Sequence, residues 1–210
     1  MKPIIGIILR NETLPSKNKI LYINKEIIKI INKNNGIPIG IDIKNVYEII
    51  NNIDGFIFQG GNEYPKEEKK LIKYLHKNNI PTLGICLGMQ EIAESFDGTL
   101  QEIENHQNTT HEINIRQNTK LYDIIKKDKT IVNSRHKFAI KKTNLEISAT
   151  NENTIEAIED KKKDFFIGVE WHPESLNNKD SNNLFIYFIK KAGEYNEFKR
   201  NNKSNTWNNT

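Results

Sequence analysis

The chain has 210 residues, which is enough for one domain with a complete hydrophobic core and short for two. Its net charge is +4, but the lysines are interspersed with acidic residues, as in residues 66–70. This pattern is typical of solvated helix faces and argues against a nucleic-acid partner. The single cysteine excludes an internal disulfide and fits a reducing compartment.

Two further observations bear on location. No apolar run approaches the roughly 20 residues that a membrane span requires. The apolar stretch at residues 1–9 is too short for a secretion signal with a cleavage site. We therefore expect a cytoplasmic protein that makes no membrane contact.

Short apolar runs and helical segments alternate along the first half of the chain. The runs carry β-branched residues, which predicts strands buried on both faces at residues 3–9, 37–41, 54–58 and 82–85. Apolar residues at helical spacing predict helices at residues 22–31, at 45–51, from residue 65 onward and directly after residue 86. This order predicts an α/β fold with a doubly wound, mostly parallel, flavodoxin-like sheet.

The second half of the chain has a different pattern. Strand-like segments follow one another at hairpin distances, at residues 130–133, 137–140, 146–149, 155–158 and 165–169. They predict a small antiparallel extension that returns to the central sheet. A last helix is expected at residues 184–192, so residues 1–192 would form a single domain. The polar, Asn-rich residues 193–210 are expected to be a flexible tail.

The most informative segment lies between the fourth predicted strand and its helix. Its sequence, Gly-Ile-Cys-Leu-Gly-Met-Gln at residues 84–90, has the G-x-C-x-G pattern, the cysteine form of the nucleophile elbow. Such a turn strains the backbone of Cys86, and its two glycines let strand and helix pass closely. The helix N-terminus favours a thiolate, and the free amide of Leu87 can donate to an oxyanion. The alternative is an inert cysteine buried at a strand end.

A second polar motif, Trp-His-Pro-Glu at residues 171–174, follows the last predicted strand. Parallel strands share their carboxyl edge, so His172 is expected to lie near Cys86. Pro173 ends the strand, and Glu174 can turn back to orient the imidazole, which gives a nucleophile, a base and an orienting acid. Taken singly, His172 could be a packing residue and Glu174 a helix-terminal acid.

These two motifs resemble the class I glutamine amidotransferase superfamily, and within it most closely the γ-glutamyl-γ-aminobutyrate hydrolase family, also called peptidase family C26. Further segments fit in order at residues 3–7, 54–61, 132–136 and 155–158. The resemblance covers about residues 1–192. It implies a single catalytic domain that cleaves γ-glutamyl amides through a γ-glutamyl thioester and releases glutamate.

The resemblance also implies roles for other residues. The amides of Gly60, Gly61 and Leu87 would form an oxyanion hole, and Gln90 would help to hold the glutamyl group. The residues that would line the glutamate pocket are Ser134, Arg135 and His136. Each group also has a purely structural interpretation. Gly60 and Gly61 could be a plain turn after a strand, Gln90 a polar residue on a half-buried helix, and residues 134–136 a polar hairpin edge. No metal or cofactor is implied, and the cysteine and histidines lack the spacing of zinc ligands.

Two features depart from the hydrolase pattern. Family hydrolases usually carry Arg directly after the nucleophile, whereas this chain has Leu87, which matches the amidotransferases that channel ammonia. The loop at residues 62–65 is also very short for a family hydrolase. A short loop predicts loose selection of the leaving amine, unless residues 104–111 cover it. One rival hypothesis is a glutaminase subunit that supplies ammonia to a separate synthetase, and another is a non-catalytic binding domain. The sequence also leaves open whether the protein forms a homodimer.

Overall fold

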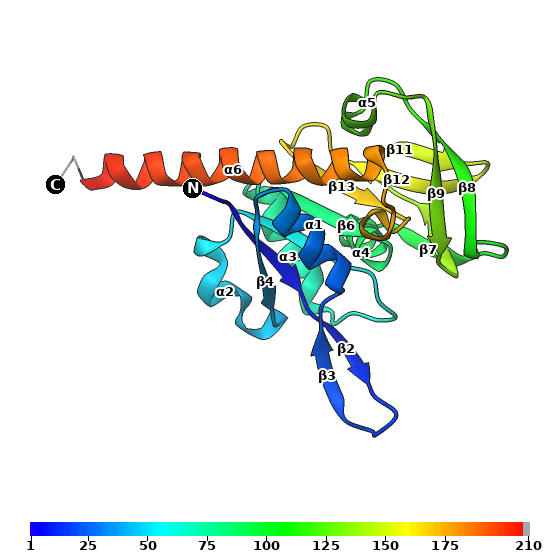
Figure 1. Cartoon of the computed structure of the whole chain (residues 1–210), viewed down its shortest axis with the longest axis horizontal. Coiled ribbons are helices and arrows are strands. Elements are labelled where there is room, and N and C mark those ends of the chain that lie inside the picture. The colour runs from blue at the N-terminus through cyan, green and yellow to red at the C-terminus, as the bar shows by residue number, and fades with distance from the viewer. Residues whose placement is uncertain (208–210) are drawn as a thin grey trace.

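The computed structural model of the protein describes residues 1–207 and contains a long sheet with helices on both faces (Figure 1). The parallel strands are β1 Ile4–Ile8, β4 Ile37–Ile41, β5 Gly55–Phe58, β6 Thr82–Ile85 and β13 Phe166–Val169. They are ordered β4-β1-β5-β6-β13. The predicted α/β fold with a parallel central sheet is therefore confirmed.

Helices cover the two faces of this sheet. They are α1 Lys25–Lys33, α2 Val46–Ile49 between 3-10 turns at Ile43–Asn45 and Ile50–Asn52, α3 Glu67–Lys77, α4 Leu87–Ser95 and α6 Lys179–Trp207. On β1, Ile7 packs in a cluster with residues of α1 and α6, whereas Ile8 packs in another with residues of α3 and α4. Successive strand side chains point to opposite faces, so a sheet covered twice requires continuous apolar runs.

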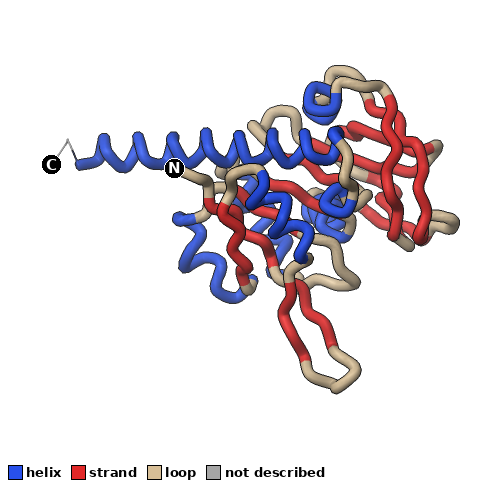
Figure 2. The backbone as a smooth tube through the Cα atoms, viewed as in Figure 1, coloured by secondary structure: helices blue, strands red, loops and turns tan. Residues whose placement is uncertain are grey.

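An antiparallel extension continues the sheet beyond β13. Its strands are β7 Thr99–Glu102, β8 Gln107–Ile115, β9 Lys129–Arg135, β10 Phe138–Lys142, β11 Glu146–Asn151 and β12 Thr154–Glu159, with α5 Lys120–Ile125 between β8 and β9. The order runs β13-β12-β11-β8-β9, and β10 joins β12 to β7. Figure 2 shows these strands gathered at the end of the molecule opposite the C-terminus. Strands β7 and β8 were not predicted.

A hairpin of β2 Arg10–Thr13 and β3 Lys19–Tyr22 forms a separate sheet and projects from the body (Figure 1). It was not predicted. The Gln59 side chain joins its two ends. Its amide donates to the carbonyls of Ile8 and Tyr22, at 3.0 Å each, and its oxygen accepts from the Asn24 amide at 2.9 Å. The base of the hairpin is therefore fixed to the end of β5.

The last helix differs from its prediction. Helix α6 extends to Trp207, so residues 193–207, expected as a loose tail, are helical, and residues 208–210 lie outside the described residues. The Asp54 carboxylate explains part of this, since it accepts from Asn196 at 2.8 Å and pairs with Lys199 at 2.7 Å. Within the described residues no helix is both long and apolar enough to cross a membrane.

Candidate active site

Cys86 lies at the turn between β6 and α4 with φ 52° and ψ −110°, a conformation that is costly for any residue other than glycine. Its amide donates to the Val169 carbonyl of β13 at 2.8 Å. Its carbonyl accepts from the amides of Met89 and Gln90 in the first turn of α4. These bonds hold the strained residue at the carboxyl edge of the parallel sheet, where the sequence predicted an elbow.

The two glycines of the elbow are required by packing. A Cβ atom at Gly88 would lie 2.0 Å from the Phe58 carbonyl oxygen. A Cβ atom at Gly84 would lie 2.6 Å from the Gly88 carbonyl oxygen. Neither contact can be relieved without moving backbone, so strand β6 and helix α4 approach each other only because both positions lack a side chain.

The surroundings of Cys86 act on the pKa of its thiol in both directions. Burial raises its pKa, and the neighbouring Glu170 carboxylate adds to the rise. The Leu87 amide, which donates to the sulfur, and the more distant Arg10 act in the opposite direction but are outweighed. The amide of Leu87 at the helix N-terminus acts in the expected direction, towards a thiolate, but burial and Glu170 raise the pKa by more than it lowers it.

The imidazole of His172 is positioned by three side chains. Its Nδ1 lies 2.8 Å from Glu174 Oε1, and because a carboxylate only accepts, Nδ1 carries a hydrogen, which leaves the lone pair of the neutral ring on Nε2. Asn133 of β9 accepts from the His172 amide at 2.8 Å and donates to its carbonyl at 3.1 Å. Asn24 donates to the same Glu174 oxygen at 3.2 Å. The sequence analysis identified His172 and Glu174 but neither asparagine.

Gly60, which follows β5, lies close to both His172 and Cys86. A Cβ atom there would be 2.8 Å from His172 Cε1 and 3.6 Å from Cys86 Cβ. The carboxyl ends of β5, β6 and β13 therefore meet, as the parallel topology requires. Gly61 packs against the Arg10 side chain, whose Cδ would lie 3.1 Å from an added Cβ.

A buried arginine supports this loop from behind. Arg10 donates from Nε and Nη2 to the Gln59 carbonyl, at 3.0 and 2.7 Å, directly before Gly60. It also pairs with Glu68 at 2.7 Å and Glu91 at 2.8 Å, and all three side chains are at most 1% exposed. Burial raises the pKa of Glu91, while the Arg10 charge lowers it. The only signal for this group in the sequence is weak, an arginine directly after a predicted apolar strand.

A pocket of about 190 Å³ opens beside Cys86. Its lining residues are Gly61, Asn62, Cys86, Leu87, Gln90, Gln107, Arg135, His136, Lys137 and Phe138. Two of these, Arg135 and Lys137, carry positive charge, and no carboxylate is among them. The pocket therefore suits a ligand with at least one anionic group.

The four predicted substrate contacts fall into two groups. Arg135, His136 and Gln90 line the pocket, although Gln90 Nε2 already donates to Glu170 at 2.5 Å and to the Phe138 carbonyl at 3.1 Å. Ser134 does not line it, because its buried hydroxyl points the other way and donates to the His106 carbonyl. Burial, and then the charge of Glu156, raise the pKa of Glu170.

Comparison with known proteins gives a consistent result. Residues 18–192 match the Glutamine amidotransferase class-I family. The CTP synthase of Nautilia profundicola is 30% identical over 203 residues, covering 72% of this chain and 37% of that protein. The gamma-glutamyl-CDP-amidate hydrolase of Campylobacter jejuni is 37% identical over 113 residues, covering 52% of this chain and 50% of that protein. The glutaminase domain of Trypanosoma brucei CTPS has a TM-score of 0.75 at 15% identity, covering 91% of this chain and 94% of that one.

The chain belongs to the class I glutamine amidotransferase family. It matches half or less of the length of the two curated relatives, and the solved structure supports the fold alone. Family membership and the hydrolase among the relatives support an amide hydrolase of the glutamine amidotransferase type.

Proposed function

We propose that this protein is a cytoplasmic cysteine hydrolase of γ-glutamyl amides, similar to the γ-glutamyl-γ-aminobutyrate hydrolases, with residues 1–192 as its catalytic domain. Cys86 is the nucleophile, His172 the base and Glu174 the acid that orients the base. The observation that carries the proposal is the meeting of these groups around Gly60, with the Nε2 lone pair of His172 available because Glu174 holds Nδ1.

The reaction is an acyl transfer in two halves. His172 Nε2 takes the thiol proton as Cys86 Sγ attacks the γ-carbonyl carbon, and the amides of Gly60, Gly61 and Leu87 donate to the developing oxyanion. The C–N bond then breaks, the amine leaves with the proton from His172, and a γ-glutamyl thioester remains. A water molecule, deprotonated by His172, attacks the thioester and releases glutamate and the thiol. The raised pKa of Cys86 makes proton removal by His172 necessary.

The lining residues divide between the two ends of the substrate. The Arg135 guanidinium can bind the glutamyl α-carboxylate, with Gln90 and His136 beside it. Lys137 then remains for the other end of the substrate, together with Gln107, which belongs to the segment at residues 104–111. The relative named gamma-glutamyl-CDP-amidate hydrolase supports γ-glutamyl amides as the substrate class.

This division changes the expected selectivity. The short loop at residues 62–65 predicted loose selection of the amine, but Gln107 and Lys137 border the pocket as well. A surplus cation favours a leaving amine that carries negative charge. We therefore propose γ-glutamyl amides of acidic amines, of which γ-glutamyl-γ-aminobutyrate is the simplest, as the substrate class.

The test compares γ-glutamyl-γ-aminobutyrate, γ-glutamyl ethylamide and glutamine as substrates of the isolated protein. We expect turnover of all three with the highest kcat/KM for the acidic amine, and no activity in Cys86→Ala. Lys137→Met should lower kcat/KM for the acidic substrate by about fivefold, which corresponds to the loss of about 1 kcal/mol from an exposed ion pair. The same variant should leave kcat/KM for the ethylamide unchanged. Lys141→Met, an exposed lysine of β10 outside the pocket, is the matched control. Hydrolysis that persists in Cys86→Ala contradicts the proposed nucleophile.

A second candidate is a glutaminase that supplies ammonia to a synthetase acting in trans. Leu87, the short 62–65 loop and the CTP synthase among the relatives favour it. It predicts that the isolated protein turns over none of the three amides and that glutamine hydrolysis appears only when a partner synthetase is added. A partner synthetase is required only by this candidate, and a homodimer remains a prediction under either one.

A further inference from the structure

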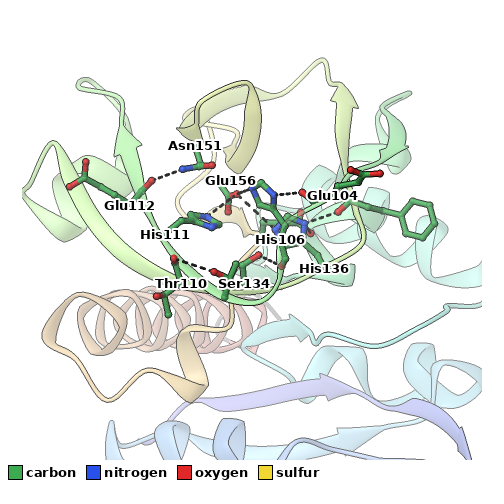
Figure 3. A network of polar contacts seen from close by, with 12 residues as sticks. Glu104, His106, Thr110, His111, Glu112, Ser134, His136, Asn151 and Glu156 are labelled. Atoms are coloured by element: carbon green, nitrogen blue, oxygen red, sulfur yellow. Dashed lines mark hydrogen bonds and ion pairs between the residues drawn. The ribbon is translucent and has the colours of Figure 1, made fainter.

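Three of the five histidines gather on the antiparallel extension, and one of them, His136, also lines the pocket beside Cys86. Figure 3 shows His106, His111 and His136 arranged around Glu156. His106 directly precedes β8, His111 lies on β8, His136 follows β9, and Glu156 lies on β12. Antiparallel pairing of β8 with β9, and of β11 with both β8 and β12, brings these remote segments together.

The spacing of the four polar atoms resembles that of metal ligands. The Nε2 atoms of His111, His106 and His136 lie 3.1, 3.7 and 3.9 Å from Glu156 Oε1. The candidate ligand atoms of His106, His111 and Glu156 all lie within 4.8 Å of one another. Zinc bonds of about 2.0–2.1 Å in a tetrahedron place neighbouring ligand atoms about 3.3 Å apart. Small side-chain adjustments would therefore close the cluster around one ion.

Backbone carbonyls fix the tautomers that a metal requires. His106 Nδ1 lies 3.0 Å from the Glu104 carbonyl oxygen, and His136 Nδ1 lies 2.8 Å from that of Phe138. A carbonyl oxygen only accepts, so both Nδ1 atoms carry hydrogen. The Nε2 atom of each neutral ring then carries a lone pair that faces the Glu156 carboxylate. A backbone carbonyl in this role is typical of metal-binding histidines.

The facing atoms are buried and unsatisfied. Among the described residues, none of the three Nε2 atoms, nor Glu156 Oε1, has a hydrogen-bond partner, and Glu156 is only 1% exposed. Lone pairs directed at a carboxylate in a buried site repel it. Protonating all three rings would place three positive charges around one carboxylate. The centre of the His106 ring lies only 5.0 Å from that of His111 and 5.1 Å from that of His136. A single cation among the four atoms satisfies every one of them.

We propose that His106, His111, His136 and Glu156 bind one Zn²⁺ ion. Imidazole and carboxylate ligands suit zinc, and four protein ligands complete its tetrahedron, so the site is structural. The ion would join β8, the β9–β10 turn and β12, and would fix His136, which lines the pocket beside Cys86. No metal was expected from the sequence because its histidines lack zinc-ligand spacing, whereas these four residues come from three separate segments, at the start of β8, after β9 and on β12.

The test is zinc binding by the chelator-stripped full chain, measured by calorimetry and by elemental analysis after desalting. We expect one zinc per chain and a rise in melting temperature on adding zinc. Binding should be at least about 100-fold weaker in His111→Gln and Glu156→Gln. His76→Gln is the matched control, since His76 pairs with Asp160 away from the cluster. Cys86→Ser, which removes the only cysteine, should keep the zinc.

Cobalt substitution gives a measurement that does not depend on variants. Bound Co²⁺ in the wild-type protein should show the intense visible absorption of tetrahedral coordination, and zinc should displace it. The proposal is overturned if the stripped wild-type chain binds no zinc at micromolar free metal, or if folded His111→Gln still retains one zinc per chain. Either result would leave the cluster as an ion pair of Glu156 with a protonated histidine. None of these measurements depends on the hydrolase activity.

Discussion

Replacing Arg10 tests how the loop at Gly60 is held in place. Arg10→Ala leaves the Glu68 and Glu91 carboxylates buried without a cation, and the Gln59 carbonyl loses both of its side-chain donors. Breaking a buried ion pair by removing one partner costs about 3–5 kcal/mol. In a chain of this size each kcal/mol lowers the melting temperature by about 2–4 °C, so Tm should fall by about 6–20 °C.

The pH dependence of this loss has a definite sign. Burial already raises the pKa of Glu91, and removing the Arg10 charge, which lowers that pKa, raises it further. A carboxyl with a raised folded-state pKa adds stability below its unfolded pKa and loses it as pH rises through the folded value. The deficit of Arg10→Ala relative to wild type should therefore shrink on going from neutral to mildly acid pH.

Thermal unfolding followed by circular dichroism, across this pH range, measures both effects. Lys29→Ala, which removes an exposed pair with Glu26, is the control and should change Tm little. The variant that combines Arg10→Met with glutamine at both Glu68 and Glu91 should recover part of the loss, because no buried charge remains. A deficit below about 1 kcal/mol for Arg10→Ala, or one that is independent of pH, would refute the reasoning.

Three further predictions concern the proposed acyl-transfer site. Because burial raises the pKa of Cys86, its alkylation by iodoacetamide should still accelerate above about pH 10, where the urea-unfolded chain, with a thiol pKa of about 8.5, has levelled off. A plateau below about pH 7 would reveal a thiolate in the folded protein. His172→Ala should lower kcat by about 10²–10⁴-fold, and Glu174→Gln should lower it by less. A Glu174→Gln variant as active as wild type would assign Glu174 a purely structural role. Gly88→Ala should either fail to fold or melt far below wild type, because its added Cβ meets the Phe58 carbonyl. Gly193→Ala in α6 is the control: its added Cβ meets nothing within 4 Å, and the free energy of unfolding in a urea titration should rise by about 1 kcal/mol.

The parallel sheet and the elbow could be predicted because their signals are local. Continuous apolar runs mark strands covered on both faces, and the G-x-C-x-G spacing follows from the contact of Gly88 with the Phe58 carbonyl. The hairpin at residues 10–22 escaped prediction because most of its side chains are exposed and show no buried periodicity. The helical residues 193–207 escaped because the contacts of Asp54 with Asn196 and Lys199 join distant parts of the chain.

The supporting residues of the site could not be predicted for the same reason. Asn133 is one asparagine in an Asn-rich chain, and only the folded structure shows that it holds both the amide and the carbonyl of His172. Arg10 reads as the end of a strand until Glu68 and Glu91 are placed beside it. Sequence patterns identify residues that act through their immediate neighbours, whereas partners on different elements become visible only when topology is known.

The attachment of the β2–β3 hairpin at Gln59 makes its turn a suitable insertion site. The Gln59 side chain bonds both ends of the hairpin, so the turn between the strands can change length without moving the central sheet. Residues 14–18 therefore offer a position for a short affinity tag, an inserted epitope or a cysteine-free fluorophore. Such a label would let immobilisation, imaging or pull-down proceed on an enzyme whose sole thiol stays unmodified.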